Sequence, residues 1–430
     1  MRVCVVGGGG REHALARALA RTADVVVTPG NAGMAAPIVV DESPPEQIDA
    51  DLYVVGPEAP LVAGLADNLR AAGHPVLGPG ADGALLEGSK SFMKDVLSAA
   101  GVPTARYAAF DALQVREALT YLETMPGPWV IKTDGLAAGK GVLVTRSLDE
   151  ARHDVMDKLS GAAFGDAGRN VVIEEGLEGE ECSLLVLCDG TRVVPLVPAQ
   201  DFKRVGDGDA GPNTGGMGSY APMTLDVRNA QGTRAPNVEG ILETAVRPLV
   251  AELRRRGIDY RGVLYAGLML TDDGPKIIEY NVRFGDPEAQ VVLPLLESDA
   301  AELFLAAANG ALHEVESPRF TSEAAVCVVL AAPGYPEAPR VGDAIDGLAP
   351  DGQAVKSRAG VTVFHSGTRH HGSDGTFSTA GGRVLGVTAV GPTLDRARAD
   401  AYAVAETIEF DGRQMRRDIA ATAAHPEEVR

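Results

Sequence analysis

Cysteine is scarce in this sequence of 430 residues, and no Cys-x-x-Cys pair occurs. The four cysteines are scattered along the chain, and each lies in an apolar run; they are Cys4, Cys182, Cys188 and Cys327. Such a distribution gives no disulfide framework, so we expect reduced cysteines in the core of a cytoplasmic protein.

Positive charge is also in short supply, because 39 lysines and arginines stand against 59 aspartates and glutamates. The formal net charge of −20 argues against a nucleic-acid partner. Any positive potential must therefore be local, at sites that face phosphates. Long apolar runs are missing too: VCVV at 3–6 is too short for a signal peptide, and no run approaches the length of a membrane span.

Two common nucleotide-binding motifs are absent. Around Gly135 and Gly139 the spacing does not match a Walker A loop, and Gly141 follows Lys140 where that loop has Ser or Thr. The dinucleotide motif GxGxxG fails near the N-terminus, because Glu12 stands where its last glycine belongs.

The segment 276–288, KIIEYNVRFGDPE, is rich in charged side chains and places them just after a strand-like apolar run. Alternate residues of a strand share a face, so Glu279 and Asn281 point the same way, and a carboxylate beside an amide oxygen suits Mg²⁺. Arg283 continues that face and could clamp a phosphate. The segment therefore predicts a metal and phosphate site.

Glycines and lysines upstream predict a flexible loop that covers the phosphates of a ligand. The segment 129–144, WVIKTDGLAAGKGVLV, reads as strand, glycine loop and strand, and such glycines let backbone amides approach phosphate oxygens. Lys132 in the first strand can reach a phosphate as a point charge. Lys90 follows Ser89, which we expect to cap a helix that ends at Gly101.

Residues 1–101 alternate β-like runs with helical stretches, including His13–Arg21 and Leu61–Ala72, which predicts a parallel α/β domain. Its first turn places Gly9, Gly10 and Arg11 at a helix start, the usual place for an anion. A sugar monophosphate fits this turn better than a dinucleotide does. We expect this turn, and Glu58 in the same domain, to lie apart from the lysine and metal sites.

Several motifs together resemble the phosphoribosylamine-glycine ligase family of the ATP-grasp superfamily. They are GGREHA at 9–14, GPEAPL at 56–61, the segment 129–144, QDFKRVGDGDAGPNTGGMG at 200–218 and RFGDPE at 283–288. The resemblance runs from residue 1 to about residue 420. Thr133 and Tyr280 stand where the family usually has Ala and Phe, and neither change removes a functional group.

The resemblance implies a multidomain protein of mixed α/β and α+β class. Its units are an N-terminal parallel α/β domain over 1–101 that binds phosphoribosylamine, an ATP-grasp domain over 102–330 with a mobile lid near 123–191, and a small C-terminal α/β domain over 331–430. The implied reaction joins glycine to 5-phosphoribosylamine at the expense of ATP, through glycyl phosphate, giving glycinamide ribonucleotide, ADP and phosphate in purine biosynthesis.

The resemblance also implies roles for individual residues. Catalytic roles fall to Arg283, Lys203 and Asp201. ATP contacts fall to Lys90, Lys132, Gly139, Lys140, Glu174, Leu177 and Glu180. Substrate contacts fall to Gly9, Gly10, Arg11, Glu12, Asn31, Glu58, Arg204 and Asp286. Mg²⁺ or Mn²⁺ would bind Glu279 and Asn281. We expect no membrane or nucleic-acid partner and a monomer, with a dimer as the alternative.

Three other functions stay open from the sequence. Another ATP-grasp enzyme, such as a biotin carboxylase or a carboxylase of aminoimidazole ribonucleotide, would share Lys132 and Glu279. A nicotinamide oxidoreductase would need the dinucleotide motif that fails at Glu12. A nucleotide-binding module would bind ATP without turnover. A zinc site at His365, His370 and His371 is disfavoured, since no cysteine or regularly placed carboxylate accompanies them.

Overall fold

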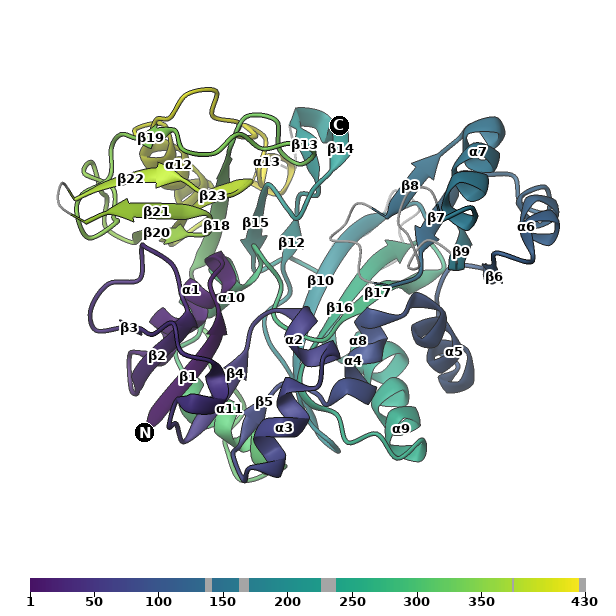
Figure 1. The fold of residues 1–430 in the computed structure, drawn as a ribbon, viewed down its shortest axis with the longest axis horizontal. Coiled ribbons are helices and arrows are strands. Elements are labelled where there is room, and N and C mark those ends of the chain that lie inside the picture. The colour runs from purple at the N-terminus through teal and green to yellow at the C-terminus, as the bar shows by residue number, and fades with distance from the viewer. Residues whose placement is uncertain (136–140, 162–169, 226–236, 373–374, 425–430) are drawn as a thin grey trace.

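The computed structural model describes residues 1–135, 141–161, 170–225, 237–372 and 375–424 (Figure 1). The first unit is a five-stranded parallel sheet in the order β3-β2-β1-β4-β5, which confirms the predicted parallel N-terminal domain. Its strands are β1 (Arg2–Gly7), β2 (Asp24–Pro29), β3 (Val39–Val40), β4 (Leu52–Val55) and β5 (Val76–Leu77). The valine-rich runs in β1, β2 and β4 are buried, as expected for a sheet covered on both faces.

Two helix predictions in this unit need correction. Helix α1 (Gly10–Leu19) begins three residues before the predicted start, directly after the glycine turn. The stretch predicted as one helix over 61–72 is two helices, α2 (Glu58–Val62) and α3 (Leu65–Ala71). Gly64 separates them with a φ of 86°, a left-handed conformation that interrupts an α-helix. Helix α4 (Ala81–Gly88) follows.

Helix α5 (Lys90–Ala100) has the predicted caps. The Ser89 side chain accepts a hydrogen bond from the Phe92 backbone N–H, and Gly101 ends the helix with a φ of 66°. Both predicted ends of this helix are therefore confirmed.

A separate antiparallel sheet follows in the order β6-β9-β7-β8, covered by two helices; we call it the β6–β9 unit (Figure 1). Its elements are β6 (Tyr107–Asp111), α6 (Val115–Leu122), β7 (Trp129–Thr133), β8 (Val142–Thr145), α7 (Leu148–Leu159) and β9 (Asn170–Glu175). Leu122, Ile131, Val155 and Ile173 belong to its own hydrophobic core. The unit stands at the right of Figure 1, away from strands β1, β2 and β3 at the left.

The central sheet is antiparallel in the order β11-β10-β16-β17. Its strands are β10 (Glu180–Asp189), β11 (Val193–Pro195), β16 (Arg261–Thr271) and β17 (Gly274–Asn281). The associated helices are α8 (Val238–Ile241), α9 (Arg247–Arg255), α10 (Ala289–Leu295) and α11 (Ala300–Asn309), and a π-helical turn over Leu242–Val246 joins α8 to α9. The last residues of β17 carry the predicted metal ligands.

A further antiparallel sheet, in the order β12-β15-β18-β23-β20, brings the segment 200–221 beside the C-terminal part of the chain. Its strands are β12 (Gln200–Asp201), β15 (Gly218–Ala221), β18 (Ala324–Ala331), β20 (Val361–His365) and β23 (Arg383–Gly391). Around it lie the hairpin β13 (Arg204–Gly206) and β14 (Ala210–Asn213), the small sheet β19 (Ala344–Ile345), β21 (Thr368–His371) and β22 (Thr376–Thr379), and helices α12 (Leu394–Ala405) and α13 (Ala421–Ala424).

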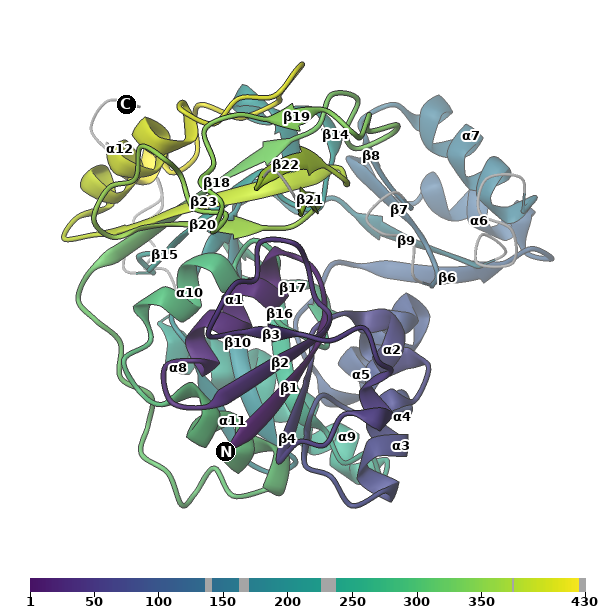
Figure 2. The same cartoon turned by 60° about the vertical axis from the view of Figure 1, so that its left-hand side comes forward.

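The C-terminal sheet packs on the N-terminal unit through α1 and α10 (Figure 2). The His365 backbone N–H donates to Nδ1 of His13 at 3.0 Å, and Asn31 Nδ2 donates to the His365 carbonyl at 2.7 Å. The His365 ring contacts Thr368 and Gly352, and burial lowers its pKa to about 4. His13 and His365 therefore connect the N-terminal unit to the C-terminal sheet.

Two features are absent from the described residues. No group of three histidine, cysteine or acidic side chains lies close enough to hold a metal ion. No helix in this part of the chain is long and apolar enough to cross a bilayer.

Candidate active site

A buried charge cluster joins the β6–β9 unit to α5. Glu174 on β9 pairs with Lys132 Nζ on β7 at 2.9 Å and with Lys94 Nζ on α5 at 3.0 Å. Burial works to raise the pKa of Glu174, but the two lysines hold it below its ordinary value. One carboxylate thus faces two ammonium groups, which leaves an excess of positive charge. Lys132 Nζ also donates to the Ile278 carbonyl on β17 at 3.1 Å, so this charge borders the central sheet.

Lys90 lies where α5 meets the glycine loop. Its backbone N–H donates to Asp134 Oδ1 at 2.6 Å, and its Nζ donates to the Gly135 carbonyl at 2.9 Å. Burial lowers the pKa of the Lys90 ammonium, although Glu279 opposes this effect. The first residues of the loop are therefore tied to α5. The predicted ATP contacts Gly139 and Lys140 lie outside the described residues.

The predicted metal ligands share one face at the end of β17. Asn281 Nδ2 lies 3.4 Å from Glu279 Oε1. Burial works to raise the pKa of Glu279, but Lys203 and Lys132 hold it below its ordinary value, so the side chain is a carboxylate at neutral pH. Two oxygen ligands suit Mg²⁺, which commonly completes its shell with water and substrate phosphates. The residues present therefore fit a magnesium ion bound together with a nucleotide.

Arg283 connects this face to the N-terminal unit. Its guanidinium lies 2.6 Å from Glu87 Oε1 and 3.3 Å from Glu58 Oε2, and it also donates to Asn281 Oδ1 at 3.3 Å. Burial works to raise the pKa of Glu58, but Arg283 holds it below its ordinary value. The expectation that Glu58 lies apart from the metal site is therefore wrong: one guanidinium touches both.

Lys203 is held by two carboxylates on neighbouring strands. Its Nζ lies 3.0 Å from Asp201 Oδ1 and 3.0 Å from Glu181 Oε2. Burial works to lower the pKa of Lys203, but these carboxylates raise it well above its ordinary value. Beside them Ser183 Oγ contacts the Tyr265 hydroxyl at 2.9 Å. The ammonium therefore stays charged at neutral pH.

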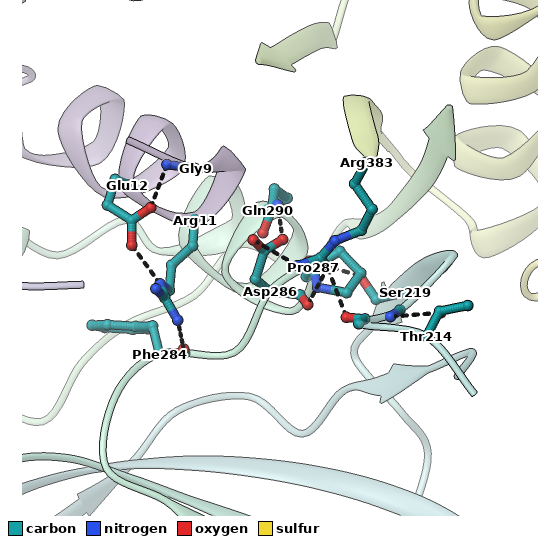
Figure 3. A network of polar contacts seen from close by, with 12 residues as sticks. Gly9, Arg11, Glu12, Thr214, Ser219, Phe284, Asp286, Pro287, Gln290 and Arg383 are labelled. Carbon is teal, nitrogen blue, oxygen red and sulfur yellow. Dashed lines mark hydrogen bonds and ion pairs between the residues drawn. The ribbon is translucent and has the colours of Figure 1, made fainter. Parts of the chain in front are cut away.

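The glycine turn before α1 is closed by its own side chains (Figure 3). The Gly9 N–H donates to Glu12 Oε2 at 2.6 Å, and Arg11 Nε lies 2.6 Å from Glu12 Oε1. Arg11 also donates to the Phe284 carbonyl at 3.3 Å. Asn31 Nδ2 donates to the Gly8 carbonyl at 3.0 Å. The turn is thus tied to the RFGDPE segment that follows β17.

Asp286 in that segment sits in a second network (Figure 3). Gln290 Nε2 donates to its Oδ1 at 2.7 Å, and Arg383 NH2 lies 3.2 Å from its Oδ2. Burial works to raise the pKa of Asp286, but Arg383 and Arg11 hold it below its ordinary value. Asp286 therefore carries a negative charge beside the glycine turn.

Three predicted site residues do not join these clusters. Arg204 donates to the Gly211 carbonyl within its own hairpin at 2.8 Å. Glu180 is exposed at the start of β10, and Leu177 is half-buried in the turn between β9 and β10. No contact between these three residues and the charged clusters occurs within the described part of the chain.

The residues of these networks that escaped the sequence-based prediction include Lys94, Glu87, Gln290 and Arg383. Lys94 carried a usable signal, because it lies one helical turn after Lys90 and the two share a face of α5. Glu87 and Arg383 carried none, since they meet their partners across 196 and 97 residues of sequence.

Family models cover most of the chain. Models described as the N domain, the ATP-grasp (A) domain and the C domain of phosphoribosylglycinamide synthetase match residues 1–87, 88–289 and 325–422 respectively.

Individual relatives agree with those models over their full length. The phosphoribosylamine--glycine ligase of Streptomyces coelicolor is 47% identical over 440 residues, which cover 99% of this chain and all of the relative. That of Escherichia coli K12 is 45% identical over 446 residues, with complete coverage of both chains. The crystal structure of the Thermotoga maritima phosphoribosylamine--glycine ligase superposes with a TM-score of 0.82 at 35% identity, covering 98% of this chain and 100% of that one. The chain therefore belongs to the phosphoribosylglycinamide synthetase family of ATP-grasp ligases.

Proposed function

We propose that this chain joins glycine to 5-phosphoribosylamine, the two reactants that its relatives' name gives, and converts ATP to ADP and phosphate. The observation that carries the proposal is the convergence of charge on the end of β17. The ammonium groups of Lys203 and Lys132 lower the pKa of Glu279 against the effect of burial, and Arg283 extends from the same segment to the N-terminal unit. Such a site can neutralise a triphosphate and a carboxylate together.

In the first step, a carboxylate oxygen of glycine attacks the γ-phosphorus of ATP. The bond from that phosphorus to the β–γ bridging oxygen breaks, and ADP leaves with the electron pair. Lys132 and Lys90 supply positive charge for the phosphates, and Lys203 orients the glycine carboxylate. Glu279 and Asn281 would hold Mg²⁺ or Mn²⁺, which supplies further charge neutralisation to the phosphate oxygens when bound.

In the second step, the amine of phosphoribosylamine attacks the acyl carbon of glycyl phosphate. The carbon–oxygen bond to phosphate breaks, inorganic phosphate leaves, and the nitrogen loses a proton as the amide forms. The glycine turn with Gly9, Gly10 and Arg11 is placed to bind the sugar phosphate at the start of α1. Asp286 and Glu58 lie beside it and can accept hydrogen bonds from the sugar or amine.

The domain division is part of the proposal: an N-terminal sugar-binding domain over 1–101, an ATP-grasp domain over 102–330 and a C-terminal domain over 331–430. The lid near 123–191 includes most of the β6–β9 unit. The separate core of that unit supports its movement as one body. The free buried cysteines support a cytoplasmic location.

Hydrogen exchange measures this movement. We expect backbone amides of β7, β8 and β9 to exchange more slowly once a non-hydrolysable ATP analogue and Mg²⁺ are added, because nucleotide holds the unit against the central sheet. Amides in the β1–β5 sheet, which the nucleotide does not bridge, serve as the internal control. Unchanged exchange throughout the β6–β9 unit would argue against closure.

Sugar recognition is testable at the glycine turn. The Arg11→Gln variant should raise the KM for phosphoribosylamine at least tenfold, a loss of about 1.4 kcal/mol or more, because it removes a charge beside the sugar phosphate. The affinity for ATP, measured by calorimetry with Mg²⁺, should change by less than about 1 kcal/mol. Lost ATP affinity with normal sugar affinity would show that this turn serves the nucleotide instead.

An assay for ADP with each reactant omitted in turn tests the function as a whole. We expect ADP release to require both glycine and phosphoribosylamine for full rate and to yield one amide per ADP. Release that depends on bicarbonate and not on glycine would identify a carboxylase instead. ATP binding without any turnover would identify a nucleotide-binding module.

A further inference from the structure

We propose that Arg383, the first residue of β23, is a positioning residue that holds two loops in a fixed relation to each other. One loop supports Lys203, which is proposed to orient glycine, and the other lies against the glycine turn, which is proposed to bind the sugar phosphate. This inference rests on the proposed function. The guanidinium reaches two loops at once: NH1 donates to the Gly215 carbonyl at 2.7 Å and to the Asp286 carbonyl at 2.6 Å. NH2 also pairs with the Asp286 carboxylate, as Figure 3 shows.

Gly215 is held on both sides by the C-terminal part of the chain. Its N–H donates to the Tyr335 hydroxyl at 2.9 Å, while its carbonyl accepts from Arg383. A Cβ atom at Gly215 would lie 3.0 Å from the central carbon of the guanidinium, so the arginine packs directly on this backbone. Gly216 lies against Pro287 in the same way, with 2.5 Å between a built Cβ and Pro287 Cδ. The two loops therefore form one packed layer.

The first loop sets the backbone of the site lysine. The Thr214 N–H and hydroxyl both donate to the Lys203 carbonyl, at 2.7 Å and 2.8 Å. The same hydroxyl accepts from the Gly216 N–H at 3.0 Å. A displacement of Gly215 therefore moves the Lys203 backbone, and with it the ammonium proposed to orient glycine.

The second loop touches the glycine turn. Gln290, which donates to Asp286, has its Nε2 only 2.7 Å from the position of a Cβ on Gly10. Asp286 Oδ2 lies 3.6 Å from the corresponding position at Gly9. Asp286 and Gln290 thus form a wall of the turn proposed to bind the sugar phosphate.

Arg383 is therefore the link between the two reactants, and it sets how closely the amine approaches the acyl carbon. Without the link, glycyl phosphate still forms, but the amine is misplaced. Water then attacks the acyl carbon and the carbon–oxygen bond to phosphate breaks, so glycine is regenerated and the phosphate that came from ATP is released. The net result is ATP hydrolysis without amide.

The test is the ratio of ADP to amide in one reaction mixture with the Arg383→Gln variant. We expect amide formation to fall about 100-fold, the effect of misplacing a reactant by roughly 1 Å. ADP release should fall by no more than about tenfold, so the ratio should rise at least about tenfold, while the KM for ATP stays near the native value. A purely structural role would lower both products equally and leave the ratio unchanged.

Arg398→Gln is the matched control, because Arg398 also donates to two backbone carbonyls, those of Ile419 and Arg417, without contacting either loop. It should keep the native ratio. Arg383→Lys should give an intermediate ratio, since an ammonium cannot reproduce the guanidinium fork, and it decides the question if the glutamine variant does not fold. Native ratios in both Arg383 variants would overturn the inference alone. A native enzyme without glycine-dependent ADP release would overturn the proposed function as well.

Discussion

We expect the Glu279→Gln variant to release ADP, with all substrates present, at about one-hundredth of the native rate or less. Glutamine keeps the volume and one oxygen of glutamate but removes the charge that faces Lys203 and Lys132. The site then holds the metal–phosphate complex less well. The rate at saturating ATP and Mg²⁺ is the measurement that checks this expectation.

Glu302→Gln is the matched control, because Glu302 is an exposed carboxylate on α11 whose side chain contacts none of the charged clusters. It should keep native activity. Both variants should melt close to the native temperature, since neither changes core volume. Near-native turnover in Glu279→Gln would remove Glu279 from the proposed metal site.

The Lys132→Met variant should lose activity by about 100- to 1000-fold, because it removes a positive charge aimed at the transferred phosphate. It should nevertheless stay folded. Glu174 keeps Lys94 as a partner, so the buried cluster becomes a neutral pair. We expect the free energy of unfolding to fall by no more than about 2 kcal/mol, below the cost of leaving a buried charge unpaired.

Glu174→Gln makes the opposite change and is the informative comparison. It leaves two buried lysines without a carboxylate, so we expect it to lose about 3–5 kcal/mol of stability. Urea unfolding of both variants measures the difference. If Lys132→Met were the less stable of the two and retained activity, the excess positive charge would be structural and not a phosphate site.

Local sequence patterns predicted much of the fold. The caps of α5 at Ser89 and Gly101 and the strand that carries Glu279 and Asn281 were readable from neighbouring residues. The break between α2 and α3 was not, because an isolated glycine such as Gly64 can also occur within a helix. Only packing decides which occurs.

The candidate site likewise contains residues that local sequence predicts and contacts that it does not. Glu279, Asn281 and Arg283 could be grouped because a strand places alternate side chains on one face. The bridge from Arg283 to Glu58 and Glu87 could not be predicted, since it joins residues 225 and 196 positions apart. Contacts of that kind depend on how the N-terminal unit docks, for which a single sequence has no local signal.

Transfer of oxygen from glycine to phosphate tests the central claim most directly. Glycine labelled with ¹⁸O in its carboxylate is turned over with ATP, Mg²⁺ and phosphoribosylamine, and the inorganic phosphate is analysed by mass spectrometry. Because the carboxylate oxygen that attacks ATP leaves with the phosphate, each phosphate should carry one ¹⁸O from glycine. Phosphate without ¹⁸O, formed in step with amide, would contradict a glycyl phosphate intermediate and the ligase chemistry proposed for this site.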